Sequence, residues 1–158
     1  MRVLWFINDP VPAFAEWLGI SRHPGVGWVT TLADALMLSG KVNLCIFCYA
    51  NGNTLIHTTI DNVEHYAIPA MPSRHGRFIL NESTINAARY IENTFRPDII
   101  HIHGTEYNMG LLSAQNIFST PTVIPLQGII DICQHYLFGG ISIWNILKYR
   151  TFRDWITG

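Results

Sequence analysis

Two histidines near residue 100 are the side chains best suited to do chemistry. His101 and His103 alternate with isoleucines in an apolar run that predicts a β-strand, so both imidazoles point to one face of a sheet. His103 stands at the predicted strand end beside Gly104, where a ligand can approach and an imidazole can orient a hydroxyl group. We interpret His101, within the strand, as a core histidine. A zinc site formed by this pair and Glu106 is an alternative, but His-x-His spacing is a weak signal and we predict no metal.

A glycine-containing turn precedes a predicted helix and could hold an anion. Gly25 and Gly27 lie just before the helical pattern, where free backbone N–H groups and the helix dipole favour a phosphate. The dinucleotide fingerprint G-x-G-x-x-G is absent because position 30 is Thr30, and the P-loop pattern is missing. These absences argue against nicotinamide binding. A plain turn is an equally weighted alternative to a phosphate site.

Polar residues also follow other predicted strands, at the edge where open α/β sheets bind ligands. Asp9 follows the first strand, Glu106 follows the strand of the histidines, and Gln127 and Gly128 follow the last strand. This is more polarity at the strand ends than packing requires. We therefore predict a ligand site along this edge.

The cysteines do not indicate a disulfide framework. Cys45 and Cys48 match C-x-x-C, but they lie inside Val42–Ala50, which has the continuous apolar character of a buried strand. A redox pair should open a helix, and a zinc site would need a second pair. We interpret both as buried strand cysteines, and Cys133 as a third reduced thiol.

Short β-rich runs alternate with helical ones along most of the chain. This pattern predicts an α/β fold, a Rossmann-like parallel sheet with helices on both faces. The predicted strands are 2–8, 42–49, 99–103 and 122–126, with a hairpin or edge pair at 57–60 and 63–68; the predicted helices are 28–39, 81–95 and 109–118, and residues 9–27 are predicted to be a long loop.

Composition restricts the partners of the protein. The chain is 49% apolar and only 13% charged, with a net charge of −1, so no basic field attracts nucleic acid. No run reaches the roughly 20 apolar residues needed to cross a bilayer. We expect a cytoplasmic protein.

The aromatic and basic tail 141–158 is predicted to be helical. It would either pack on another domain or contact the inner face of a membrane.

Three segments together resemble the N-terminal domains of glycosyltransferase family 4. The most specific is Pro97-Asp98-Ile99-Ile100-His101-Ile102-His103-Gly104, which is similar to the family's fourth strand. The turn 25–28 with the helix 29–36 and the strand 121–128 are similar in the same chain order.

The resemblance implies a GT-B enzyme that transfers a hexose, with retention, from a nucleotide-diphosphate sugar, without a cofactor or an essential metal. It places Gly25 and Gly27 beside the donor diphosphate and His103 at the transferred sugar. Asp9, Glu106, Gln127 and Gly128 would line the acceptor side. The family setting would be polysaccharide or cell-envelope assembly, with a glycan or lipid-linked acceptor.

The family's donor-binding domain carries a spaced glutamate pair that this chain lacks. None of the five glutamates is followed by another eight positions later. We therefore expect a truncated N-terminal half, with a domain over 1–140 and a tail over 141–158, which is inactive without the C-terminal domain. Two alternatives stay open: another GT-B enzyme such as a nucleotide-sugar epimerase, and a non-catalytic α/β binding or partner module.

Overall fold

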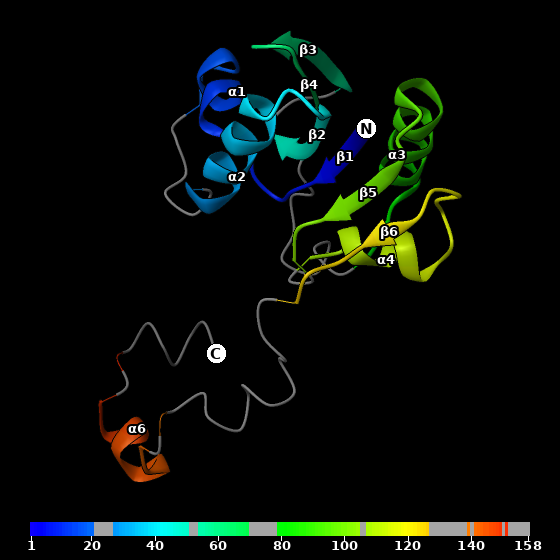
Figure 1. Cartoon of the computed structure of the whole chain (residues 1–158). Helices are drawn as coiled ribbons and strands as arrows, with labels where there is room; N and C mark the ends of the chain where they lie inside the picture. The colour runs from blue at the N-terminus through cyan, green and yellow to red at the C-terminus, as the bar shows by residue number, and fades with distance from the viewer. Residues whose placement is uncertain are drawn as a thin grey trace. The chain divides into compact units, whose positions relative to one another are not determined.

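The computed structural model describes residues 1–20, 27–50, 54–69, 79–104, 107–126, 139, 141–149 and 151. The chain divides into two compact units, Met1–Pro125 and Leu126–Gly158. The first unit is an α/β fold with a six-stranded sheet (Figure 1). This confirms the predicted Rossmann-like class. The domain boundary expected after residue 140 stays a prediction.

The sheet has the strand order β3-β4-β2-β1-β5-β6. All neighbouring strands are parallel except β3 and β4, which form an antiparallel hairpin. The strands are β1 (Arg2–Phe6), β2 (Asn43–Ala50), β3 (Ile56–Ile60), β4 (Val63–Pro69), β5 (Ile99–Ile102) and β6 (Thr122–Val123). Both hairpin turn residues, Asp61 and Asn62, have positive φ values of 49° and 64°. Two left-handed residues give the tight turn that matches strand twist, so the predicted hairpin is confirmed.

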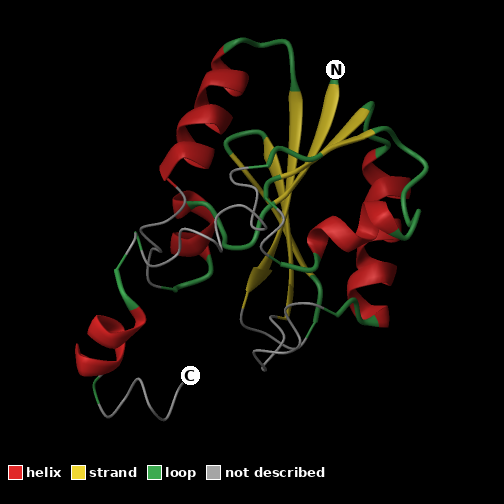
Figure 2. Ribbon diagram, turned by 90° about the horizontal axis from the view of Figure 1, so that it is seen from below, coloured by secondary structure: helices red, strands yellow, loops and turns green. Residues whose placement is uncertain are grey.

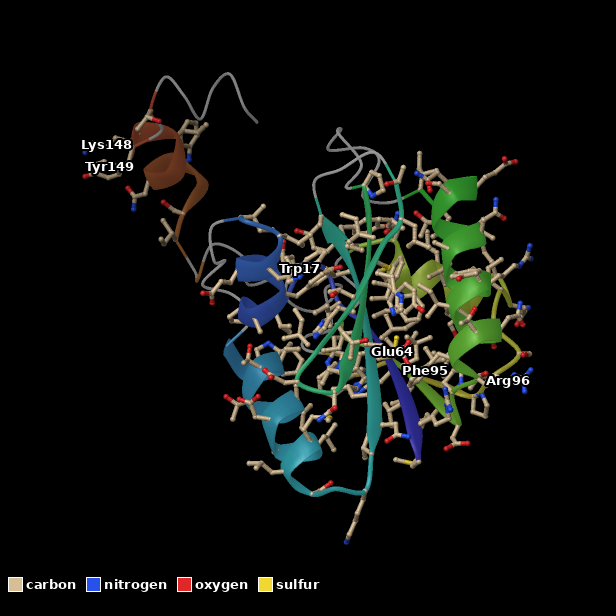
Figure 3. All side chains as sticks on the ribbon, turned by 90° about the horizontal axis from the view of Figure 1, so that it is seen from above. Trp17, Glu64, Phe95, Arg96, Lys148 and Tyr149 are labelled. Carbon is tan, nitrogen blue, oxygen red and sulfur yellow. The ribbon has the colours of Figure 1, made fainter. Side chains whose placement is uncertain are left out.

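Helices cover both faces of the sheet (Figure 2, Figure 3). On one face α1 (Pro12–Trp17) and α2 (Gly27–Leu38) pack on Val3, Trp5 and the other buried residues of one core cluster. On the other face α3 (Glu82–Phe95) packs, with α4 (Met109–Ala114) contributing Met109 and Leu112, on a second cluster. The alternation of strand side chains explains this division, because Leu4 and Phe6 point away from Trp5.

Helix ends agree with their local signals. Asn81 caps α3 by accepting a hydrogen bond from Thr84 N–H at 2.8 Å. At the other end Arg96 adopts φ 51° and donates its N–H to Glu92 O, just before Pro97. Gly40, with φ 63°, follows the end of α2, where a left-handed glycine commonly terminates a helix.

The structure differs from the predicted elements most clearly in one missed helix and two elements that end early. Residues 12–17, predicted to be loop, form α1, since Pro12 suits a first helical position and Phe14 is fully buried. The helix predicted to reach residue 118 ends at Ala114, because Asn116 turns left-handed with φ 53°. The strand predicted over 122–126 is only Thr122–Val123.

The second unit contains α6 (Ile143–Tyr149), within the segment predicted to be helical. Asn145 N–H donates to Ser142 O at 2.9 Å at the start of this helix. Trp144 is 77% exposed in this unit. Among the described residues, no helix combines the length and the apolar character that a membrane crossing requires.

Candidate functional site

The sheet order reverses between β1 and β5, and this point defines the candidate site. From β1 the chain continues to β2 and β4 on one side, and it returns by α3 to β5 on the other. The two strands are tied beyond their ends, where His103 N–H donates to Phe6 O at 2.8 Å. Such a reversal opens a crevice at the carboxyl ends of the strands, where ligands bind in open α/β sheets.

His103 occupies this point, enclosed by aromatic rings. Its ring centroid lies 4.5 Å from that of Trp5, 5.2 Å from that of Trp28 and 3.8 Å from that of His101. We call His101, His103, Trp5, Trp28 and the adjacent Gly27 the switch-point site. The predicted common face of the two histidines is confirmed.

The imidazole of His103 is buried without a hydrogen-bond partner among the described residues. The side chain is 6% exposed, and neither Nδ1 nor Nε2 has a partner there. An unsatisfied buried polar group costs about 1–3 kcal/mol, which a ligand that hydrogen-bonds to it recovers. Both ring nitrogens are buried, so a hydroxyl or amide group can reach them only if the surrounding side chains move.

Burial determines the charge of His103. It lowers the pKa of the imidazole from 6.5 to about 3, with a smaller contribution from His101 in the same direction. At neutral pH the ring is uncharged, so it presents one N–H donor and one nitrogen acceptor. This arrangement suits orientation of a substrate hydroxyl and does not suit proton donation by an imidazolium.

His101 is not the enclosed core residue that its position within the strand indicated. It is only partly buried, although burial lowers its pKa, and its ring also lies 5.9 Å from that of Trp5. The interpretation as a core histidine is wrong, because this part of the sheet face is incompletely covered. His101 belongs to the wall of the site.

Gly27 begins α2 next to this cluster. A Cβ atom built on it would meet nothing within 4 Å, so there is open space at its surface. The following residue, Trp28, carries the ring that contacts His103. The first turn of a helix has N–H groups without intrahelical partners, and these favour an anion.

Asp9 lies at the same edge, on the β2 side of β1. The neighbouring Asn8 accepts a hydrogen bond from Tyr49 N–H at 3.3 Å, which fixes this segment beside the end of β2. Burial raises the pKa of Cys48, and the carboxylate of Asp9 adds to this shift. Asp9 is partly exposed and available to a ligand at this edge.

Four predicted site residues lie outside the described residues: Gly25, Glu106, Gln127 and Gly128. Their roles stay predictions, as does the zinc alternative that involved Glu106. In the part of the chain that is described, no group of three or more His, Cys, Asp or Glu side chains is placed to hold a metal ion.

The cysteines of the C-x-x-C pattern are buried on β2, as predicted. Cys45 lies in the core cluster under α3 and Cys48 in the cluster under α1 and α2. Residues three apart in a strand point to opposite faces, so these thiols cannot share a metal or a disulfide. Burial raises the pKa of both, which leaves them as inert thiols.

Sequence analysis missed the two tryptophans that enclose His103. Trp5 pairs in register with His101 across β1 and β5, a contact that depends on strand order.

Sequence analysis also missed Asn108, which is 2% exposed. Its side chain accepts a hydrogen bond from Tyr49 Oη at 2.9 Å and donates one to Ile79 O at 2.8 Å. This network fixes the chain beyond β5. The spacing of these residues in sequence gave no signal for it.

Comparison of the chain with protein-family models, curated proteins and solved structures finds no match in any of the three.

Proposed function

We propose that this chain is the acceptor-side domain of a retaining, sugar-transferring enzyme of the GT-B type, which uses a nucleotide-diphosphate sugar. The observation that carries the proposal is the neutral imidazole of His103, which has no hydrogen-bond partner among the described residues and contacts the Trp28 ring from the start of α2 at the switch point. The donor diphosphate would lie at Gly27 and the transferred sugar at His103. The resemblance of residues 97–104 to family 4 adds support.

Each residue has a defined part in the proposal. His103 hydrogen-bonds a sugar hydroxyl, and its pKa of about 3 keeps it neutral while it does so. Trp28, which is 46% exposed, offers an apolar ring face that suits the C–H surface of a sugar. Asp9, with Glu106, Gln127 and Gly128, would hold the acceptor. We expect the chain alone to bind sugar nucleotides weakly and to transfer sugar only with a donor-binding domain.

The test is titration of the ¹⁵N-labelled chain with UDP-glucose, UDP-N-acetylglucosamine and GDP-mannose, followed by NMR. The expected result is that at least one of them shifts the Gly27 and Trp28 amides together with the His103 ring signals. His103→Asn should weaken this binding about fivefold or more, as for loss of a buried hydrogen-bonding partner.

The matched control is His57→Asn, since the His57 side chain is 48% exposed on β3. It should leave the affinity unchanged. Absence of shifts at Gly27 and His103 with all three sugar nucleotides would contradict the proposal, as would equal effects of the two variants.

A further inference from the structure

The outer edge of β3 has no neighbouring strand in the sheet. β3 stands first in the strand order and pairs with β4 on its inner side (Figure 1). In the part of the chain that the structure describes, no backbone hydrogen bond from outside the sheet reaches β3. An edge of this kind offers its N–H and C=O groups to a strand of another chain.

The two edges of the sheet differ in how they are protected. β6, at the other edge, has only the two residues Thr122–Val123, with Pro121 before it and Pro125 shortly after it. Short strands and prolines are common means of blocking an edge. β3 has five residues in unbroken register with β4, and it contains no proline, no lysine and no bulge. One edge is therefore blocked, and the other is suited to pairing.

The hairpin turn determines which backbone groups face the free edge. The two-residue turn has positive φ at both positions, so Ile60 and Val63 close it as a hydrogen-bonded pair. Hydrogen-bonded and non-hydrogen-bonded pairs then alternate along the two antiparallel strands. The N–H and C=O groups of His57 and Thr59 are consequently directed away from β4, toward the free edge.

The sequence of β3 is complementary to itself in the antiparallel direction. A two-fold axis at Thr58 would place each Ile56 opposite an Ile60, and each His57 opposite a Thr59. The two His57–Thr59 pairs would then exchange the backbone hydrogen bonds that these residues do not make to β4. Ile56 and Ile60 pack on the core cluster under α1 and α2, so their pairing would continue this apolar face from one copy to the next.

Charge does not oppose this arrangement. His57 is the one titratable side chain of β3; it stacks on Tyr66 with centroids 4.1 Å apart, and its Nε2 lies 3.5 Å from Glu64 Oε2. In the two-fold arrangement it faces Thr59 of the other copy, so no like charges are opposed across the strands. The carboxylate of Asp61 lies one residue beyond these pairs. The net charge of −1 for each chain gives little overall repulsion.

We propose that the free edge of β3 binds the same edge of a second copy of this chain, antiparallel and about a two-fold axis at Thr58. The six-stranded sheets of the two copies would form one continuous sheet. The interface is isologous, which is the commonest symmetry of soluble oligomers. Because each copy contributes one short strand, the dimer is small in contact area and dissociates reversibly. The proposal does not depend on sugar transfer.

Sedimentation velocity of the full chain at pH 7, from low micromolar to near-millimolar concentration, tests the proposal. The wild type should change from monomer to dimer as the concentration rises. Thr58→Lys and Thr58→Glu each oppose like charges on the axis, so each alone should weaken the dimer about tenfold or more. An equimolar mixture of these two variants should restore it, because lysine of one copy then faces glutamate of the other.

The matched controls are Thr94→Lys and Thr94→Glu, since Thr94 is exposed on α3. They should leave the dimer unchanged. Thr59→Pro is an independent test, because proline removes an N–H that faces the free edge and none that faces β4. It should weaken the dimer about tenfold or more.

Circular dichroism checks that each variant is folded, and Thr59→Pro decides if the Thr58 variants are not. A wild type that stays monomeric over the whole concentration range would overturn the proposal. Equal effects of the Thr58 and Thr94 variants would also overturn it, as would a mixture of Thr58→Lys and Thr58→Glu that dimerises no better than either variant alone.

Discussion

Gly104 is the residue that turns the chain immediately after His103. Its φ of 93° lies where side-chain-bearing residues are strained. We expect Gly104→Ala to lower the free energy of unfolding by about 1–3 kcal/mol. Urea denaturation followed by circular dichroism measures this change. Since the strain would act on the segment that holds His103, sugar-nucleotide binding should weaken as well.

Gly27→Ala provides the contrast at the residue scale. Gly27 does not have a positive φ, and an added Cβ would meet nothing within 4 Å. The free energy of unfolding of Gly27→Ala should differ from that of the wild type by less than about 1 kcal/mol. Alanine is accommodated here without strain, and helices favour alanine over glycine by about that amount. If both variants lose equal stability, the left-handed conformation assigned to Gly104 is wrong.

At the scale of elements, Glu92 connects α3 to the loop before β6. Its Oε1 accepts hydrogen bonds from Ser119 N–H at 2.9 Å, Ser119 Oγ at 3.0 Å and Thr120 N–H at 2.8 Å. Burial raises the pKa of this carboxyl, but the hydrogen bonds together outweigh burial and lower it. The carboxylate therefore stabilises the fold above its unfolded pKa, and this contribution is lost as the pH falls below about 4.5.

We predict that Glu92→Ala destabilises the protein by about 2–3 kcal/mol, because two backbone donors lose a charged acceptor. Glu92→Gln keeps an acceptor oxygen on a side chain of the same length, so its loss in free energy of unfolding should be about half of that for Glu92→Ala. Urea midpoints at pH 7 compare the two. Equal losses would mean that packing of the side chain, rather than the hydrogen bonds, carries the effect.

Local signals explain which elements were predictable. The apolar runs of β1 and β2, the helical pattern of α3 and the hairpin around Asp61-Asn62 depend on residues close in sequence, and their predictions are confirmed. Helix α1 was missed because it is held by burial of Phe14 under tertiary contacts rather than by a periodic pattern.

The same distinction holds for the candidate site. Placement of His103 at a strand end followed from the alternation of residues and from Gly104. Its enclosure by Trp5 and Trp28 did not, because these rings come from β1 and α2, far away in sequence.

At the scale of the whole molecule, the buried histidines make stability depend on pH. Burial lowers the pKa from 6.5 to about 4 for His65 and to about 3 for His103. Between these values and 6.5 the unfolded chain binds more protons than the folded one, so stability falls as the pH decreases. Asp61 opposes the shift of His65, whereas His101 adds to that of His103.

We therefore expect the free energy of unfolding to fall by about 6 kcal/mol between pH 7 and pH 4, of which each histidine contributes about half. Urea titrations at intervals of one pH unit measure this slope. His65→Phe keeps the ring that stacks on Phe14 but removes the titrating group, so its slope should be about half that of the wild type. The difference should appear below pH 6.5, where the unfolded histidine becomes protonated, and vanish above it. An identical slope in the variant would show that His65 is protonated equally in both states, and that other groups control the acid sensitivity of the fold.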